Sequence, residues 1–187
     1  MLEKYIRNHI ECISNSDTSK VDELIKNSIN LIKDKGRIFI FGNGGSASDS
    51  EHFAAEIVGD FNTRGETKFP CSVLCLCSPS SIVTSISNDY SYSDLFCKQL
   101  QSHGVCNKDI VIGISTSGKS KNVLNAIKYS KTKEAYTVLL TGDIDEIAEV
   151  DCLIKAKSKV TSHIQEFHGI ILHYYAMKLE EWLTANG

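Results

Sequence analysis

Residues 37–56 read RIFIFGNGGSASDSEHFAAE, and this stretch contains the features that decide the fold. Its first five residues form a short run rich in β-branched and aromatic side chains, which is typical of a buried strand. Three of the next four residues are glycines, which favour a tight turn. The remaining residues contain neither glycine nor proline and predict a helix on which His52 and Glu56 share one face. A strand, a glycine turn and a helix in this order predict an α/β unit.

Four more short apolar runs follow this unit, and longer helical stretches separate most of them. They are 71–77 (CSVLCLC), 109–115 (DIVIGIS), 136–141 (YTVLLT) and 151–156 (DCLIKA). Strands that alternate with helices predict a parallel sheet that is covered by helices on both faces. We therefore predict an α/β fold with a doubly wound, five-stranded parallel sheet.

Helices are predicted at both ends of the chain. Apolar residues recur at helical spacing in residues 2–13 and 21–32, and the second of these helices should end near Gly36. Residues 162–184 lack proline and carry one apolar side, which predicts a long C-terminal helix. We expect residues 1–187 to form a single domain, with the helical pair in 1–35 packed on it or placed in an oligomer interface.

Composition excludes several classes of protein. The net charge of −3 and the scattered basic residues give no basic patch for nucleic acid. We find neither a signal peptide nor an apolar run long enough to cross a membrane, so the prediction is a cytoplasmic protein without membrane contacts. The seven cysteines include no C-x-x-C pair and indicate a reducing compartment. Cys75 and Cys77 should lie on one face of a strand as buried thiols.

Two of the predicted strands end in turns suited to anions. Ligands of an open parallel sheet bind at the carboxyl ends of its strands. The glycine turn at 42–45 can offer backbone N–H groups to an anion or a sugar oxygen, or it can be a purely structural turn. After the strand at 109–115, hydroxyl groups surround Gly118, and these belong to Ser115, Thr116, Ser117 and Ser120. One serine there would be a helix cap, whereas four hydroxyls favour a phosphate site.

Two groups of polar side chains are candidates for catalysis or metal binding. His52 and Glu56 are four residues apart on one helix, and Gln165 and His173 are eight apart on the last helix. Their competitors on that last helix are Glu166 and His168. Two histidines and a carboxylate suit Zn²⁺ or an acid–base pair, although an exposed His–Glu pair has the same spacing. Asn88 and Asp89 can hold sugar hydroxyls or form an ordinary turn.

Four segments together resemble the phosphoheptose isomerase family of the SIS (sugar isomerase) fold, which is flavodoxin-like. They are GNGGSASDSEHFAAE (42–56), SNDY (87–90), GISTSGKSKNV (113–123) and IQEFHGIILH (164–173). The resemblance implies a homotetramer that converts sedoheptulose 7-phosphate into D-glycero-D-manno-heptose 7-phosphate. This reaction is the first step toward nucleotide-activated heptose for bacterial surface polysaccharides.

The resemblance also implies roles for individual residues. Zinc, one ion per subunit, is implied at His52, Glu56, Gln165 and His173. Substrate binding is implied for Asn43, Gly44, Gly45, Glu56, Asn88, Asp89, Ser115, Thr116, Ser117, Ser120 and Gln165. Isomerisation through an enediolate needs a base, an acid and stabilisation of negative charge. We assign the proton transfer between C1 and C2 to Glu56 and the transfers at the oxygens to His173.

The chain departs from the family pattern at two positions. Asp60 and His163 stand where an arginine is common in the family. If those arginines neutralise the substrate phosphate, this chain must use another cation or prefer a related substrate. The candidates for that role are Arg64, Lys68 and Lys119.

Three other functions fit parts of the pattern. SIS-fold adaptors that bind DnaA lack the carboxylate and the final histidine that Glu56 and His173 provide. A non-catalytic sugar-phosphate sensor needs only the serine turn. An isomerase of a pentose or hexose phosphate would keep the chemistry and change the groups that recognise the sugar.

Overall fold

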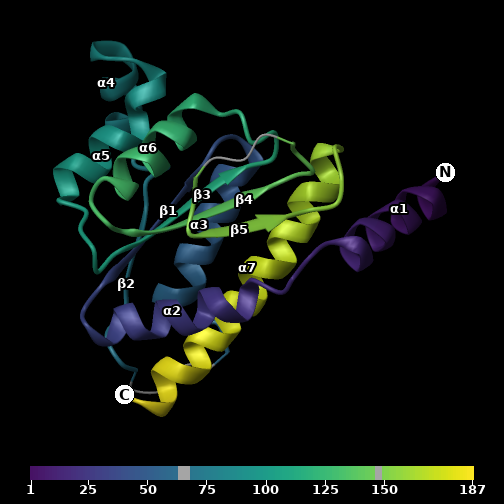
Figure 1. Ribbon diagram of the computed structural model, residues 1–187, viewed down its shortest axis with the longest axis horizontal. Helices are drawn as coiled ribbons and strands as arrows, with labels where there is room; N and C mark the ends of the chain where they lie inside the picture. Colours follow the sequence, from purple (N-terminus) through teal and green to yellow (C-terminus); the bar gives the residue numbers. More distant parts are fainter. Residues whose placement is uncertain (63–67, 146–148) are drawn as a thin grey trace.

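A five-stranded parallel sheet forms the centre of the computed structural model, which describes residues 1–62, 68–145 and 149–187 (Figure 1). The strand order is β2-β1-β3-β4-β5, and this confirms the predicted doubly wound sheet. The strands are β1 (Arg37–Gly42), β2 (Ser72–Cys75), β3 (Ile110–Ser115), β4 (Tyr136–Thr141) and β5 (Cys152–Lys155). The sheet therefore contains all five predicted strands. Most of the segment 62–69, which its composition marks as an exposed loop, lies outside the described residues.

Helices cover both faces of the sheet, as its alternating side chains require (Figure 1). Ile38 and Ile40 of β1 are fully buried on the face that carries α2, α3 and α7. Phe39 and Phe41 are fully buried on the opposite face, against α5 and α6. The helices are α2 (Val21–Lys33), α3 (Gly45–Gly59), α5 (Leu95–His103), α6 (Lys121–Lys131) and α7 (Thr161–Ala185).

The contact between α3 and α7 positions the candidate site. The rings of Phe53 on α3 and Tyr175 on α7 stack at 5.2 Å between centroids, with only 7° between their planes. The Tyr175 hydroxyl then donates a hydrogen bond to Oγ of Ser28 on α2, at 2.6 Å. Because both rings are fully buried, this stack fixes how the two helices lie against each other.

Two further helices lie at the periphery of the molecule. Helix α1 (Leu2–Asn15) contacts α7 and buries only Cys12 among its residues. Figure 1 shows α1 extending away from the sheet. Helix α4 (Ser80–Asp89) follows β2, buries none of its residues, and leads through a 3₁₀ turn at Tyr92–Asp94 into α5. Within the described part of the chain, no helix has the length and apolar character needed to span a bilayer.

The expectation that Cys75 and Cys77 share a buried face is wrong. Strand β2 ends at Cys75, and the next two residues form a turn that breaks the alternation of side chains. Cys75 packs against the core on the side of α3 and α7, whereas Cys77 packs against the opposite core. Both thiols are half-buried and free.

Candidate functional site

Three side chains from α3 and α7 form a compact polar cluster. Nε2 of His52 lies 2.8 Å from Oε1 of Glu56, one helical turn further along α3. Nε2 of His173, on α7, lies 3.3 Å from the same oxygen and 3.3 Å from Nε2 of His52. The structure therefore brings together the helix pair His52 and Glu56 and the distant His173.

The cluster is suited to a divalent metal ion. One ligand atom from each of His52, Glu56 and His173 lies within 4.8 Å of the other two. Imidazole nitrogens and a carboxylate are ligands that zinc prefers. The Glu56 side chain is only 10% exposed, and its Oε2 is buried without a hydrogen-bond partner among the described residues. A buried carboxylate oxygen in this state has an unmet need for a cation or a donor, so these residues fit a metal of the zinc type.

Gln165 lies on α7, and its side chain reaches the start of α3. Its side-chain amide occupies the space into which a Cβ atom on Gly45 would point. A side chain at position 45 would therefore displace the end of the Gln165 side chain from this position.

A cleft of about 440 Å³ opens between α3 and α7 at the cluster. His52, Gln165 and His173 line it, together with Glu166, which is a competitor on α7. Its wall also contains Asp49, which the sequence did not single out. The further lining residues are Gly45, Ser48, Gly169 and Leu172.

Asp49 is an acidic group in an unusual environment. Burial raises the pKa of its carboxyl group, and the nearby Glu166 carboxylate adds to this effect, while His52 and His173 oppose it. Its Oδ2 is buried and has no hydrogen-bond partner in the parts of the chain that the structure describes. The signal for Asp49 in the sequence is its spacing, because it lies one turn before His52 on the same face of α3.

The serine turn after β3 is organised around Gly118, which has a φ of +64°. Ser115 Oγ donates a hydrogen bond to Ser120 Oγ at 3.0 Å, and Ser117 Oγ accepts one from the Lys119 N–H at 3.2 Å. Ser120 is the residue that precedes α6, yet its side chain makes no capping hydrogen bond to that helix. The helix-cap explanation therefore does not hold for Ser120. In the first turn of α6, the N–H of Val123 donates to Oδ1 of Asn122, so that N–H is not available to an anion.

A second cavity, of about 820 Å³, adjoins this turn. Its lining includes Thr116, Ser117, Gly118 and Lys119 from the turn, and Lys159 from the loop that precedes α7. Hydroxyl groups and two lysines in one cavity are a suitable environment for a phosphate group. Two acidic side chains, Asp143 and Asp145, also line this cavity.

The other predicted binding residues are placed differently. The side-chain amide of Asn43 is hydrogen-bonded to Asn122 and Tyr92. Gly44 has a φ of +57° and is the N-cap residue that precedes α3. Asn88 and Asp89 are exposed at the end of α4, bond to each other at 2.9 Å, and line neither of the two cavities.

The departures Asp60 and His163 are both explained by local contacts. Lys68 Nζ lies 2.7 Å from Asp60 Oδ1 and 2.7 Å from Glu180 Oε1, so Lys68 is engaged in ion pairs away from the serine turn. Arg64 lies outside the described residues. Of the three candidate cations, Lys119 is the one that the structure places in the turn.

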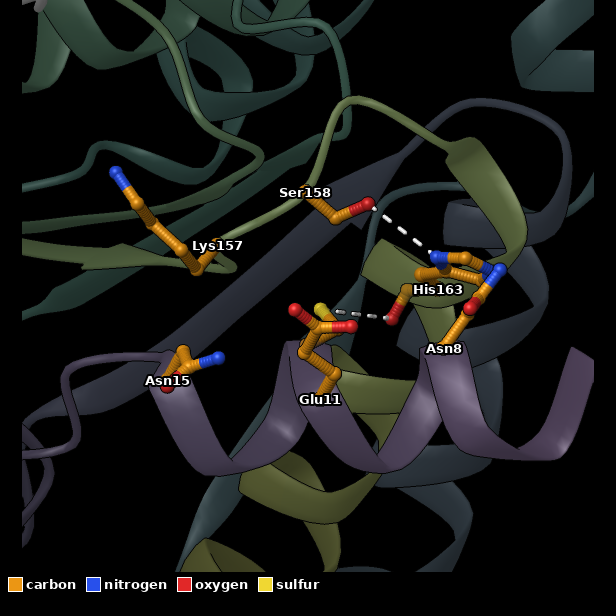
Figure 2. A pocket seen from close by; sticks show the side chains of 7 residues that line it. Asn8, Glu11, Asn15, Lys157, Ser158 and His163 are labelled. Carbon is orange, nitrogen blue, oxygen red and sulfur yellow. Dashed lines mark hydrogen bonds between the residues drawn. The ribbon is translucent and has the colours of Figure 1, made fainter. Parts of the chain in front are cut away.

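His163 lines a separate cavity, of about 650 Å³, between α1 and the start of α7. Figure 2 shows Nδ1 of His163 facing Oγ of Ser158, at 3.4 Å, with Asn8 and Glu11 of α1 nearby. The His163 ring also lies 4.2 Å from the ring of His9. His163 is therefore part of the contact between α1 and α7 and lines neither the cleft nor the serine-turn cavity.

His168 belongs to the core. It is fully buried, and its Nε2 donates a hydrogen bond to the carbonyl oxygen of Thr141 at 3.2 Å. Burial lowers the pKa of His168 to about 4, so the ring is neutral at physiological pH. Of the two competitors on α7, only Glu166 reaches the cleft.

Comparison with known proteins agrees with this fold. A family model described as SIS domain matches residues 3–142 and defines the class of the fold. A phosphoheptose isomerase of Helicobacter pylori is 37% identical over 179 residues, which cover 92% of this chain and 91% of that protein. A phosphoheptose isomerase of Thermodesulfovibrio yellowstonii is 38% identical over 183 residues, covering 97% and 85%. The chain therefore belongs to the phosphoheptose isomerase family of SIS-domain proteins.

Solved structures support the same assignment. The phosphoheptose isomerase of Neisseria gonorrhoeae superposes with a TM-score of 0.84 at 27% identity, over 95% of this chain and 97% of that one. A phosphoheptose isomerase of Francisella tularensis shares the fold, with a TM-score of 0.85 at 23% identity over 96% of each chain.

Proposed function

We propose that this protein is an aldose–ketose isomerase that converts sedoheptulose 7-phosphate into D-glycero-D-manno-heptose 7-phosphate through an enediolate. The observation that carries the proposal is the cluster of His52, Glu56 and His173 beside a cleft between α3 and α7. Its membership of the phosphoheptose isomerase family supports the choice of substrate. Its reaction would supply the first intermediate toward nucleotide-activated heptose.

The proton transfers are assigned to two side chains of the cluster. Glu56 presents a buried Oε2 without a hydrogen-bond partner in the described structure, which suits a base that moves a proton between C1 and C2. His173 is half exposed to the cleft, so its imidazole can exchange protons with the sugar oxygens. We place Asn43, Gly44, Gly45, Asn88, Asp89 and Gln165 on the sugar side of the site.

A zinc ion at His52, Glu56, Gln165 and His173 would stabilise the negative charge that develops on the sugar oxygens. These ligands come from two helices that the stack of Phe53 on Tyr175 holds together. Because a carboxylate bound to a metal is a weaker base, the roles of Glu56 as ligand and as base must be separated by experiment.

The phosphate of the substrate is assigned to the serine turn. The hydroxyl groups of Ser115, Thr116, Ser117 and Ser120 gather there with the backbone N–H groups at the start of α6. Lys119 supplies the positive charge that arginine supplies in relatives that carry it at the position of Asp60 or His163. The sugar then extends from this turn toward the α3–α7 cleft.

Assembly and location complete the proposal. We assign the chain to a homotetramer, because α1 exposes an apolar stripe on a helix that is only lightly packed on its own subunit. The cysteines of the described chain are free thiols, which suits the reducing environment of the cytoplasm.

The test is turnover in deuterated water. We expect purified protein to convert sedoheptulose 7-phosphate and to incorporate solvent deuterium at C1 or C2, because an enediolate exchanges its proton with the base. A chelator should reduce this rate, and added Zn²⁺ should restore it. Pentose and hexose phosphates serve as competing substrates. Conversion without deuterium incorporation would contradict the enediolate, and preference for a shorter sugar would contradict the substrate.

A further inference from the structure

Asn43 and Asn122 form a reciprocal pair of side-chain hydrogen bonds. Nδ2 of Asn43 donates to Oδ1 of Asn122 at 2.9 Å, and Nδ2 of Asn122 donates to Oδ1 of Asn43 at 2.8 Å. The hydroxyl of Tyr92 donates a further bond to Oδ1 of Asn43 at 2.7 Å. These contacts join three segments that are distant in sequence.

The orientation of both amides follows from the backbone. The N–H of Val123 can only donate, and it donates to Oδ1 of Asn122 at 2.9 Å. This assigns the oxygen and the nitrogen of the Asn122 amide. Nδ2 of Asn122 is then the donor to the oxygen of Asn43, while Nδ2 of Asn43 donates to Oδ1 of Asn122. Oδ1 of Asn43 accepts from both Asn122 and Tyr92, so its two lone pairs are already used.

The pair lies at the topological switch point of the sheet. Asn43 follows β1 in the glycine turn, and Asn122 lies in the first turn of α6, directly after the serine turn that follows β3. Strands β1 and β3 are neighbours whose connections leave in opposite directions, and such a point is where α/β proteins bind ligands. The amide pair is thus a direct link between the turn assigned to the sugar and the turn assigned to the phosphate.

The Asn122 end of the amide pair is buried, whereas Tyr92 is exposed to water. Asn122 is 3% exposed, so breaking its bonds to Asn43 would leave buried polar groups without partners. Tyr92 is 53% exposed and reaches the pair from the 3₁₀ turn after α4. Because Asn122 is buried, Asn43 is half-buried and both side-chain oxygens are bonded, the pair resists displacement better than an exposed contact would.

We propose that Asn122 and Tyr92 are positioning residues that act through Asn43, holding the glycine turn at a fixed separation from the serine turn. Asn43 then serves the reaction by joining the two turns, and its side-chain oxygen is not a contact for the sugar. The inference rests on the proposed function, since it concerns how the sugar end and the phosphate end of one substrate are aligned. A small displacement of a reacting group lowers the reaction rate far more than it lowers the affinity for substrate. Loss of the link should therefore mainly lower kcat.

A double-mutant cycle tests the link. We expect Asn43→Ala and Asn122→Ala each to lower kcat about 10-fold, and the double variant to be no more than 2- to 3-fold below the worse single variant. Inhibition by inorganic phosphate should change less than 2-fold in Asn122→Ala, because the serine turn itself remains. A roughly 100-fold loss in the double variant would overturn the proposal, since Asn43 would then act independently of Asn122.

Tyr92→Phe provides a variant that removes a single oxygen atom and keeps the fold. We expect it to lower kcat about 3-fold with little change in KM, while Tyr90→Phe leaves both unchanged. Tyr90 is a matched control because it is an exposed tyrosine two residues away that packs on Lys98. Equal kcat values for the two variants would show that Tyr92 has no positioning role.

Hydrogen exchange keeps the inference separate from the proposed function. Asn122→Ala and Tyr92→Phe should raise amide exchange in residues 42–47 of the ligand-free protein, whereas Tyr90→Phe should not. An inactive wild-type protein would refute the proposed function without affecting this measurement. Unchanged exchange in both variants would refute the link, whether or not the protein turns over heptose phosphate.

Discussion

The ammonium group of Lys68 lies 2.7 Å from the carboxylate of Glu180, which is only 2% exposed on α7. The second oxygen of that carboxylate accepts a hydrogen bond from the N–H of Asn62 at 2.7 Å. Burial alone would lower the pKa of Lys68, but its bonds to Asp60 and Glu180 raise the pKa above its usual value. Asn62 and Lys68, on the two sides of residues 63–67, therefore both bond to the buried Glu180. Phe61, which lies between α3 and Asn62, packs against the ring of His173, with 6.1 Å between centroids.

Lys68→Met should destabilise the protein by about 3 kcal/mol, because it removes a cation from a buried carboxylate. Lys178→Met is the matched control, since Lys178 pairs with Glu181 at the same 2.7 Å distance but the two side chains are 34% and 55% exposed. The control should cost much less than Lys68→Met, because water screens its ion pair. Urea unfolding measures both. Equal losses in the two variants would show that the Lys68 pair behaves as a surface pair.

Stability should fall in mild acid because of His168. Its pKa is lowered to about 4 by burial, whereas the unfolded chain has a value of about 6.5. Between these values the unfolded state binds the proton and the folded state does not, so stability is fully present above about pH 6.5 and declines toward pH 4. The shift corresponds to roughly 3 kcal/mol.

Urea unfolding between pH 7.5 and pH 4.5 checks this dependence. His168→Phe should flatten the decline, even where it lowers stability overall by losing the bond to Thr141. His103→Phe should leave the decline unchanged, because His103 is exposed. An equal slope in wild type and His168→Phe would assign the acid sensitivity to other groups.

Local spacing was sufficient to predict part of the site. His52 and Glu56 are one turn apart on α3, so the sequence alone places them on one face. His173 lies 121 positions from His52, and no local pattern shows that the two imidazoles come within 3.3 Å. That contact depends on how α3 and α7 pack, which is decided by the stack of Phe53 on Tyr175. The resemblance to the phosphoheptose isomerase family implied that His173 joins His52 and Glu56, which local spacing did not show.

Other groups were missed because their roles depend on tertiary contacts. Asn122 stood in a quoted motif, yet its partner Asn43 is 79 positions away. Lys68 was a candidate for phosphate binding, and no local pattern in α7 shows that Glu180 is buried and pairs with it. All five strands were predicted because a run of apolar residues indicates a buried strand. The end of β2 at Cys75 was missed because the turn that follows it has no glycine or proline to mark it.

Removing hydroxyl groups from the serine turn should weaken substrate binding. We expect the double variant Ser117→Ala and Ser120→Ala to raise KM about 10- to 100-fold with a nearly unchanged kcat, because phosphate is bound throughout the reaction. Ser102→Ala, an exposed change on α5, should alter neither constant. Steady-state kinetics with sedoheptulose 7-phosphate gives both values. An unchanged KM in the double variant would place the phosphate elsewhere.

Charges on the apolar stripe of α1 should dissociate the proposed homotetramer. Ile6 and Ile10 are 48% and 58% exposed in the single chain, so Ile6→Glu with Ile10→Glu should leave the subunit folded. Burial of a charge in an interface is costly, and we expect sedimentation to shift from the tetramer toward smaller species. Lys4→Glu on the same helix is the control for added negative charge. A tetramer that survives the double change would exclude α1 from the interface.

Glu56 and His173 distinguish an isomerase from a protein that only binds sugar phosphates. Glu56→Gln and His173→Asn keep the size of each side chain, so both variants should fold. Each should lower kcat at least about 100-fold, the scale expected when one positioned acid or base is lost. Glu51→Gln on α3 and His103→Asn on α5 are matched controls at exposed positions and should retain full activity.

Metal content then separates the two roles that the cluster supports. Oε1 of Glu56 already lies within 3.3 Å of both histidine nitrogens, whereas its buried Oε2 has no hydrogen-bond partner among the described residues. If Glu56 is mainly a ligand, Glu56→Gln should lose zinc together with activity, because an amide binds zinc less tightly than the carboxylate that it replaces. If it is mainly the base, the variant should keep zinc and lose deuterium exchange at C1 or C2. Loss of less than a few-fold in rate, with substrate still bound, would contradict both roles and leave a sugar-phosphate sensor as the better account of the site.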